Sequence, residues 1–296
     1  MKHVILANPV SGNRKGKRHG IAVQKILKKN GINSELILSE YPGHLTNIAK
    51  EFSEKENCRF YVIGGDGTLN EVVTGMLGTD SEIVVIPSGT GNDFIKNVSK
   101  YMSLRKIVNL SINAKSQKVD IIKINNNKYC VNVLNAGFDA MVAKNVDLFR
   151  KVPFLSGKGK YNLSIFYTLM QNKNFKFKIR CENDNILKGM FTLIAICNGK
   201  FYGGGVSPCK EADISDGLLN ACIIDSTRVR QKIILLPKYK KGEHYGLKQA
   251  HIVSSKNFSI VSTKNFPVSI DGEMIYTNRL KASILEKAIN VVFIEK

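Results

Sequence analysis

Short apolar runs alternate with longer amphipathic stretches over residues 1–120. The apolar runs predict strands, and the stretches between them carry apolar residues at the spacing of a helix face, as from Gly20 to Asn30 and from Leu45 to Phe52. The strand candidates are Val4 to Leu6, Leu36 to Leu38, Phe60 to Ile63 and Ile83 to Ile86. This alternation predicts a mostly parallel sheet covered by helices on both faces, with ligands at the carboxyl ends of the strands.

The pattern changes at about Val119, where strand-like runs come to dominate. Helical stretches interrupt them near Asp139 to Phe149 and Tyr161 to Gln171, and the apolar run Ile233 to Leu236 predicts a core helix. The strand-like runs are Val119 to Ile124, Tyr129 to Leu134, Phe175 to Cys181, Met190 to Cys197, Leu218 to Ile224, Phe258 to Val261 and Val268 to Ile270. This second part of the chain is therefore predicted to be a β-rich domain, with a cleft between it and the first. No apolar stretch approaches the roughly 20 residues that a membrane-spanning helix needs.

Composition and charge narrow the class of partner. The chain has 296 residues, of which 43% are hydrophobic and 23% charged, as in an ordinary globular protein. Its net charge of +20 indicates either an anionic partner or a compositional bias toward lysine. The sequence has no zinc finger, basic heptad region or aromatic-rich RNA motif, so we expect no nucleic-acid partner. The six cysteines show no paired spacing, which favours buried thiols in a reducing compartment.

The strongest chemical signal is the block Gly64-Gly65-Asp66-Gly67-Thr68-Leu69-Asn70-Glu71, which follows a predicted strand and opens a predicted helix. Glycines at such a turn let phosphate oxygens approach backbone amides closely, and a helix N-terminus favours negative charge. Thr68 is placed to cap the helix. Asp66 would repel a phosphate unless a cation lies between them, so its presence predicts Mg²⁺. The block is not a Walker A loop, because no Gly-Lys-Ser/Thr follows it.

Two further loops follow predicted strands at equivalent places. The first is Asn8-Pro9-Val10-Ser11-Gly12, with Lys15 close behind it as a candidate to neutralise phosphate. The second runs from Pro87 through Ser88-Gly89-Thr90-Gly91-Asn92 to Asp93 and Phe94, and Asp93 is a second acid for a metal. Each loop alone is compatible with a plain turn. Three such loops at one edge of a sheet predict a site for nucleotide phosphates.

Together these blocks resemble the catalytic domain of the diacylglycerol kinase family, which includes bacterial lipid kinases and sphingosine kinases. The resemblance extends over nearly the whole chain, because four later segments also match the family pattern in order. These segments are Asn135-Ala136-Gly137-Phe138-Asp139, Asn198-Gly199 with Gly203-Gly204-Gly205, Ala212 to Leu219, and Asp271-Gly272-Glu273. One departure is Ile95-Lys96, where many members carry Ala-Arg. Lysine keeps the charge there but loses the bidentate fork of arginine.

The resemblance implies an α/β fold in which a Rossmann-like, NAD-kinase-type nucleotide domain is followed by a β-sandwich-like C-terminal domain. We expect residues 1–121 with 281–296 to form the nucleotide-binding domain, since the final strand near Val291 to Ile294 would return to it. Residues 122–280 would form the β-rich substrate-binding domain. By resemblance, ATP contacts fall on Asn8, Pro9, Val10, Ser11, Gly12, Ser39, Gly64, Gly65, Asp66, Gly67, Thr68, Leu69, Asn70 and Thr90. Ser39 stands where the family often has threonine and keeps the hydroxyl.

The resemblance also implies two places for Mg²⁺. One lies far from the nucleotide and maps onto Asp213, Asp216 and the carbonyl of Leu218, for which the alternative is a surface acidic turn. The other is associated with the nucleotide and maps onto Asp66 and Asp93, with Asp120 as a further ligand.

The catalytic carboxylates are expected to be Glu273, Asp271 and Asp66. An acceptor hydroxyl needs a base nearby to take its proton. The resemblance points to the late Asp-Gly-Glu segment, with Glu273 as the first candidate and Asp271 as the second. The alternative for Asp271-Gly272 is a plain hairpin turn.

We therefore expect an ATP- and Mg²⁺-dependent lipid kinase that transfers the γ-phosphate of ATP to the hydroxyl of a membrane lipid, with diacylglycerol as first candidate and phosphatidic acid as product. Its expected place is the cytoplasm, peripherally on the inner face of the membrane, with an anionic membrane surface as partner and a homodimer left open. The segment Phe149 to Met170 is either a lipid access route or a core helix. The alternatives are a soluble NAD-kinase-like phosphotransferase, disfavoured by the Asp-Gly-Glu segment, and a non-catalytic nucleotide-binding regulatory protein, disfavoured by the retention of Asp66, Asp93 and Glu273.

Overall fold

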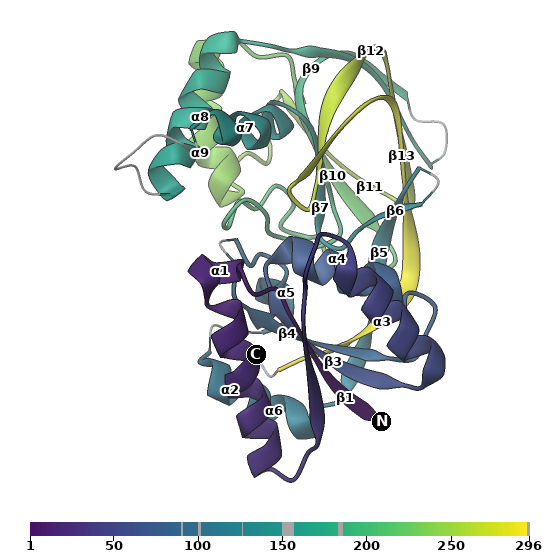
Figure 1. Ribbon diagram of the computed structural model, residues 1–296. Coiled ribbons are helices and arrows are strands. Elements are labelled where there is room, and N and C mark those ends of the chain that lie inside the picture. The colour runs from purple at the N-terminus through teal and green to yellow at the C-terminus, as the bar shows by residue number, and fades with distance from the viewer. Residues whose placement is uncertain (90, 100–101, 126, 150–156, 183–185, 295–296) are drawn as a thin grey trace.

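The computed structural model describes residues 1–89, 91–99, 102–125, 127–149, 157–182 and 186–294. Within these ranges the chain forms two halves stacked along one long axis, an α/β half built from the N-terminal residues and a β-rich half built mainly from the later ones (Figure 1). The strands of the described residues join into a single 13-stranded sheet that runs through both halves.

The α/β half is a parallel sheet with helices on both faces. Its strands lie in the order β2-β1-β3-β4, and alternate residues of β1 enter two separate cores, Val4 and Leu6 on one face and Ile5 and Ala7 on the other. Helices α3 and α4 cover the first face, and α2 and α6 cover the second. The bounds are β1 (Lys2–Ala7), α1 (Ser11–Arg14), α2 (Gly16–Lys29), β2 (Ser34–Leu38), α3 (His44–Lys55), β3 (Cys58–Gly64), α4 (Asp66–Met76), β4 (Glu82–Pro87), α5 (Ile95–Val98) and α6 (Leu104–Asn113).

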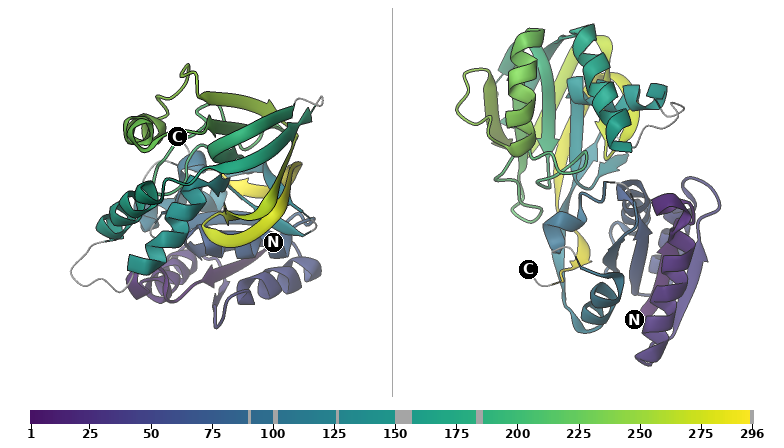
Figure 2. Two further views of the ribbon diagram at one scale, coloured as in Figure 1. Left: turned by 90° about the horizontal axis from the view of Figure 1, so that it is seen from above. Right: turned by 90° about the vertical axis from the view of Figure 1, so that its left-hand side faces the viewer.

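The β-rich half is antiparallel, with its long helices on one face of the strands (Figure 2). Phe177, Phe191 and Phe266 lie inside the strand layers, and a second core joins the strands to α7, α8 and α9. The bounds are β5 (Ser116–Ile124), β6 (Lys128–Cys130), β7 (Val133–Gly137), α7 (Phe138–Val146), η1 (Asp147–Phe149), α8 (Gly157–Gln171), β8 (Phe175–Cys181), β9 (Ile186–Cys197), β10 (Leu219–Asp225), α9 (Val229–Lys241), β11 (Ala250–Ser255), β12 (Asn257–Ile270) and β13 (Glu273–Val292).

The long strand β13 connects the two halves. It pairs with β12 near its start and with β5 along its later part, and its last residues run parallel to β4, with Asn290 opposite Glu82 and Val291 opposite Ile83. The sequence pattern indicated only the end of this strand, near Val291. The turn that precedes β13 therefore has a covalent connection, through one continuous strand, to the sheet of the α/β half.

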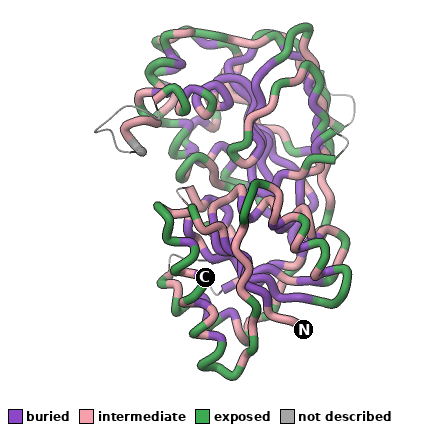
Figure 3. The backbone as a smooth tube through the Cα atoms, in the orientation of Figure 1, coloured by how far each residue is buried: buried purple, intermediate pink, exposed green. Residues whose placement is uncertain are grey.

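The predicted fold class is confirmed: alternating strands and helices are followed by a β-rich half. The prediction for Ile233 to Leu236 is wrong in one respect. Helix α9 is present, but Ile233 and Ile234 are exposed, and Leu235 is the buried member of the run. Along the described backbone, buried residues concentrate in the middle of both halves and exposed ones toward the outside (Figure 3). Among the described residues, no helix is long and apolar enough to cross a membrane.

Candidate active site

The three glycine-bearing loops meet at the carboxyl ends of β1, β3 and β4. The amide of Asn8 donates to the carbonyl of Ile63 (3.0 Å), and the amide of Ser88 donates to the carbonyl of Gly64 (2.9 Å). A Cβ atom on Gly89 would lie 2.4 Å from the Cα atom of Gly65, and one on Gly12 would lie 2.2 Å from the carbonyl oxygen of Ser88. The loops therefore pack backbone against backbone, and only glycine permits this approach.

The N-terminus of α4 faces this junction without a capping side chain. Its N-cap residue is Gly65, so the prediction that Thr68 caps the helix is wrong. The Thr68 hydroxyl instead accepts a hydrogen bond from Asn8 Nδ2 (3.4 Å), which ties the first loop to α4. The first amides of a helix have no partner within it, so this end of α4 is suited to bind an anion such as a phosphate.

The Asp66 carboxylate holds the third loop in place. It accepts hydrogen bonds from the backbone amides of Asp93 (3.0 Å) and Phe94 (3.1 Å), at the start of α5. Burial raises the pKa of Asp66, and the two backbone hydrogen bonds oppose that rise. Asp66 therefore has a structural function in addition to the metal-mediated one predicted for it.

Asp66 and Asp93 present their carboxylates to the same point. The Oδ2 atoms of both residues lie 3.2 Å from the position that a Cβ on Gly91 would occupy. Asp93 also accepts hydrogen bonds from the Lys96 ammonium group and from the Gly204 amide, the latter at 2.9 Å. The described residues contain no group of three or more acidic, histidine or cysteine side chains placed for a metal. Two carboxylates nevertheless fit Mg²⁺, which takes one or two from a protein and fills its other positions with phosphate oxygens and water.

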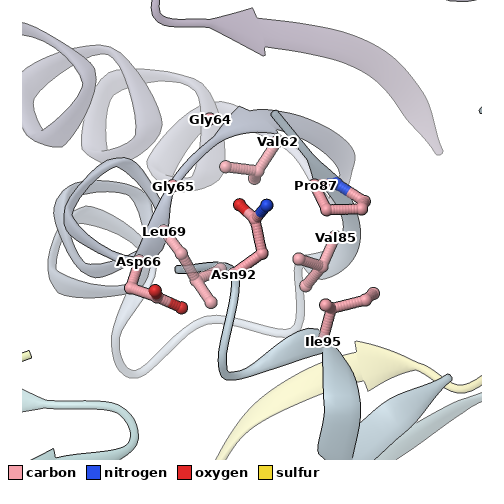
Figure 4. A pocket seen from close by; sticks show the side chains of 9 residues that line it. All are labelled: Val62, Gly64, Gly65, Asp66, Leu69, Val85, Pro87, Asn92 and Ile95. Atoms are coloured by element: carbon pink, nitrogen blue, oxygen red, sulfur yellow. The ribbon is translucent and has the colours of Figure 1, made fainter. Parts of the chain in front are cut away.

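A cavity of about 10 Å³, the space of about one water molecule, lies beneath these loops (Figure 4). Val62, Leu69 and Val85 contribute apolar walls, and the Asn92 amide projects between the Gly65 turn and Pro87. Asn92 Oδ1 accepts from the Gly89 amide and its Nδ2 donates to the Gly89 carbonyl, both at 2.8 Å. The cavity is too small for a nucleotide.

The remaining predicted nucleotide contacts have varied surroundings. Val10 is exposed and Ser11 is half-buried, just before α2. Ser39 follows β2, and its amide donates to the Ala7 carbonyl (2.9 Å), which places it beside the first loop. Asn70 Nδ2 donates to the Tyr129 carbonyl (2.8 Å) and to Asp271 (3.0 Å), so this side chain contacts the β-rich half. Thr90 lies outside the described residues.

Asp271 and Gly272 form the β12–β13 hairpin turn, with φ angles of 45° and 94°. The carboxylate of the half-buried Asp271 accepts hydrogen bonds from the side chains of Asn70 and Cys130 and from the amides of three consecutive residues, Val131 (2.6 Å), Asn132 (3.0 Å) and Val133 (3.2 Å). Burial raises the pKa of Asp271, and the hydrogen bonds, from Val131 first, oppose that rise. These hydrogen bonds occupy both carboxylate oxygens of Asp271 and connect the hairpin to α4, β6 and β7.

Glu273 opens β13 two residues later, and its side chain is exposed. Within the described part of the chain its carboxylate accepts no hydrogen bond. The contact between Asn70 and Asp271 fixes this end of the hairpin beside α4, whose first residue is Asp66. Of the two candidate bases, Glu273 is the one whose carboxylate oxygens are available to the hydroxyl group of a substrate.

Asp120 belongs with the acidic turn, not with Asp66 and Asp93. Its buried carboxylate accepts from the amides of Gly217 (2.8 Å) and Lys287 (2.6 Å). Asp216 accepts from the Leu218 amide (2.9 Å), and burial raises the pKa of Asp216, with Asp213 and Asp120 adding to that rise. The structure therefore brings the carboxylates of Asp120, Asp213 and Asp216 into one neighbourhood.

A larger cavity, of about 470 Å³, lies between the two halves near this turn. Lys96, Asp213 and Ser215 line it, together with Phe293 and Ile294 at the end of the described chain. None of the predicted nucleotide-binding residues lines it. Lys96, whose ammonium group contacts Asp93, connects this cavity to the β4–α5 loop.

Sequence reasoning gave no role to a buried cluster around Asp139. This carboxylate accepts hydrogen bonds from the hydroxyls of Tyr202 and Tyr239 (3.0 Å for Tyr239), and burial raises its pKa to about 6. Tyr202 lies in the loop whose Gly204 amide donates to Asp93. The sequence signal was the position of Asp139 at the end of the segment Asn135-Ala136-Gly137-Phe138-Asp139, which matches the family pattern.

The chain is similar to known proteins over nearly its whole length. The sequence matches the diacylglycerol kinase catalytic domain over residues 2–124 and the YegS C-terminal NAD kinase beta sandwich-like domain over residues 132–293. YtlR of Bacillus subtilis, named as a candidate lipid kinase, is 28% identical, and the match covers 92% of this chain and 93% of YtlR. A protein of Staphylococcus carnosus, also named as a candidate lipid kinase, is 25% identical, with coverages of 88% and 86%.

Solved structures show the same fold. The crystal structure of a candidate diacylglycerol kinase from Bacillus anthracis superimposes with a TM-score of 0.80 at 22% identity, covering 99% of this chain and 97% of that one. An NAD kinase from Archaeoglobus fulgidus in complex with ATP gives a TM-score of 0.56 at 12% identity, with coverages of 100% and 94%. The two matched domains together extend over nearly the whole chain, and they show that it belongs to the kinase family in which a diacylglycerol kinase catalytic domain is followed by a YegS-type C-terminal domain.

Proposed function

We propose that this kinase transfers the γ-phosphate of ATP to the hydroxyl of a membrane lipid, with diacylglycerol as the first candidate and phosphatidic acid as the product. One arrangement carries the proposal: the glycine loops with Asp66 and Asp93 lie on one side, and the Glu273 hairpin, fixed to α4 by Asn70 and Asp271, lies on the other. The lipid acceptor is supported by the names of the relatives, which are candidate lipid kinases.

On the nucleotide side, the amides of the loops and the N-terminus of α4 would hold the ATP phosphates. Mg²⁺ held by Asp66 and Asp93 would supply neutralisation of the phosphate charge. Lys96 contacts Asp93 and so keeps positive charge next to this acid, as the more common arginine would. Residues 1–121 with 281–296 would act as the nucleotide-binding domain, and residues 122–280 would bind the substrate. Asp213, Asp216 and the carbonyl of Leu218 would form a second cation site.

On the acceptor side, Glu273 would take the proton of the lipid hydroxyl. The hydroxyl oxygen forms a bond to the γ-phosphorus as the bond from that phosphorus to the oxygen of ADP breaks. The exposure of Glu273 and its lack of a hydrogen-bond partner among the described residues leave it free for this contact. Asp271 would position Glu273 and would not exchange protons itself.

The direct test incubates the purified protein with radiolabelled ATP and Mg²⁺, together with diacylglycerol, other lipid alcohols and NAD, the lipids being presented in mixed micelles. We expect the label in phosphatidic acid. Label in a different lipid alone would show that the protein is a lipid kinase with a substrate other than diacylglycerol. Label in NAD with every lipid unlabelled would show the NAD-kinase-like alternative, and no transfer to any acceptor, with ATP bound, would favour the non-catalytic regulator.

A further inference from the structure

Helix α8 packs Leu169 into the core, but it also buries polar side chains and exposes large apolar ones. Its fully buried side chains include Ser164 and Thr168, while Phe166 and Met170 are 61% and 66% exposed. The buried polar groups are satisfied: Ser164 donates to the Val142 carbonyl (2.6 Å), and Thr168 accepts from Asn145 Nδ2 (2.9 Å). A helix that hydrogen-bonds inward and exposes large apolar side chains has an outer face suited to an apolar environment.

Helix α9 packs Leu235 and Tyr239 into the same core and likewise has a buried polar side chain beside exposed apolar ones. Lys232 is 1% exposed, whereas its neighbours Ile233 and Ile234 are 55% and 66% exposed. The Lys232 ammonium donates to Asn172 Oδ1 (3.3 Å) and to the Lys173 carbonyl (3.2 Å), at the end of α8. This contact joins the two helices, which cover the same face of the β-rich half (Figure 2).

The charge of these helices indicates what covers this face. Neither α8 nor α9 contains an aspartate or glutamate. Exposed cations surround the apolar residues, namely Lys173, Arg230, Lys238, Lys240 and Lys241. A second copy of the chain would bring these cations against their own counterparts, whereas an anionic lipid surface complements them.

The same face is joined to the candidate active site. Tyr239 of α9 donates to Asp139 of α7, which also accepts from Tyr202. Two residues after Tyr202, the Gly204 amide donates to Asp93. A surface that held α8 and α9 would therefore also fix the position of the phosphate loops relative to it.

We propose that Phe166, Met170, Ile233 and Ile234, here named the α8–α9 face, insert into the headgroup region of an anionic bilayer, with the surrounding cations on the lipid phosphates. This inference rests on the proposed lipid acceptor, because an enzyme that draws its substrate from a bilayer must bind the surface of that bilayer. An apolar face inserts at the boundary between headgroups and acyl chains, and basic residues around it add attraction to anionic lipid.

The test measures sedimentation of the full chain with vesicles of phosphatidylcholine alone and of phosphatidylcholine with phosphatidylglycerol, at low and high salt. Wild-type protein should bind the mixed vesicles, and salt should weaken the binding. The double variants Phe166→Gln/Met170→Gln and Ile233→Gln/Ile234→Gln should each bind at least tenfold more weakly. Leu110→Gln, an exposed apolar residue on α6 of the other half, is the matched control and should bind as wild type does.

Kinase assays on the same variants separate this inference from the proposed function. Phosphorylation of a short-chain diacylglycerol dissolved as monomers should be unchanged in the double variants, while phosphorylation in mixed vesicles should fall. If both double variants bind vesicles as strongly as the wild type does, the proposal that the α8–α9 face inserts into the bilayer is refuted, even if the protein phosphorylates lipid. Weakened binding with every lipid alcohol unphosphorylated would support the face and refute the lipid acceptor. A wild-type dimer in light scattering that becomes monomeric in the double variants would make the face a subunit interface and overturn the proposal.

Discussion

Asp271 and Glu273 stand two positions apart at the start of β13 in different surroundings. The first is half-buried and accepts hydrogen bonds from five donors, and the second is exposed. Replacing Glu273 with glutamine should lower kcat by about 100-fold or more, because general bases contribute on this scale. Steady-state kinetics should show an unchanged KM for ATP, and thermal unfolding should show unchanged stability.

Asp271→Asn is the paired variant and should behave differently. An asparagine has one acceptor oxygen and adds two N–H donors, so buried amides of residues 131–133 would lose their partner. Each buried donor left unsatisfied costs about 1–3 kcal/mol, so the free energy of unfolding should fall measurably in urea titrations. Full activity in Glu273→Gln, together with an inactive Asp271→Asn of wild-type stability, would move the base to Asp271.

Asp66 combines two functions that one pair of substitutions can separate. Asp66→Asn keeps an oxygen for the amides of Asp93 and Phe94 but removes the charge, whereas Asp66→Ala removes both. Both variants should lose phosphoryl transfer. Only Asp66→Ala should also lower the free energy of unfolding, by about 1 kcal/mol, as the loss of a cap does. Activity within a few-fold of wild type in either variant would contradict the metal function.

The Asp139 carboxyl, which accepts hydrogen bonds from Tyr202 and Tyr239, should make stability depend on pH. Its folded pKa is about 6, against an ordinary 3.8, so the unfolded chain releases this proton first as pH rises. The stabilising contribution is complete below about pH 4 and is lost by about pH 6, a change on the order of 3 kcal/mol. The Asp139→Asn variant lacks this titration. The free energy of unfolding should be measured for both proteins across this pH range. The wild-type value, relative to that of Asp139→Asn, should fall as the pH rises from about 4 to about 6. A difference that does not change with pH would contradict the assignment.

At the scale of elements, the junction of the β3–α4 and β4–α5 loops depends on glycine. A Cβ on Gly89 would approach the Gly65 backbone to 2.4 Å, which real Cβ atoms do not do, so Gly89→Ala must push the loops apart. We expect this variant to unfold at lower temperature and to bind ATP more weakly. Gly67→Ala is the control for stability, because no atom lies within 4 Å of its Cβ position and alanine favours the helix. Equal melting temperatures for the two variants would contradict the close packing.

The order of elements could be predicted from the sequence, and the contacts between distant elements could not. The phosphate loops were identifiable because strand, glycine turn and helix follow one another within a few residues, from Cys58 to Met76. Asp120 accepts a hydrogen bond from Gly217, which is 97 residues later in the sequence. A motif match does not show which distant residues come into contact, so this pairing could not be predicted. The exposure of Ile233 could not be predicted, because an apolar run normally indicates burial. In the structure its neighbour Lys232 is buried instead, and the Lys232 ammonium donates to the Lys173 carbonyl just after α8.

At the scale of the whole molecule, the two halves share strands as well as an interface. β5 and β13 pair with each other, and each has one part in the β-rich half and one beside the α/β half (Figure 1). The hairpin of Asp271 adds a side-chain connection to Asn70 of α4. We therefore expect one cooperative unfolding transition, observed together by near-ultraviolet and far-ultraviolet circular dichroism in urea. Two separated transitions would show that the halves are independent units.

The return of β13 to β4 also bears on how the chain is made. Residues 290–291 pair with one edge of β4, so that edge stays unpaired until about 200 more residues have been synthesised. Nascent chains emerge at roughly 5–20 residues per second, so β4 exposes an apolar strand edge to other chains for ten seconds or more during each synthesis. The α/β half can complete its sheet only after Val291 has left the ribosome, and its yield in a cell should therefore depend on the chaperones that protect nascent chains.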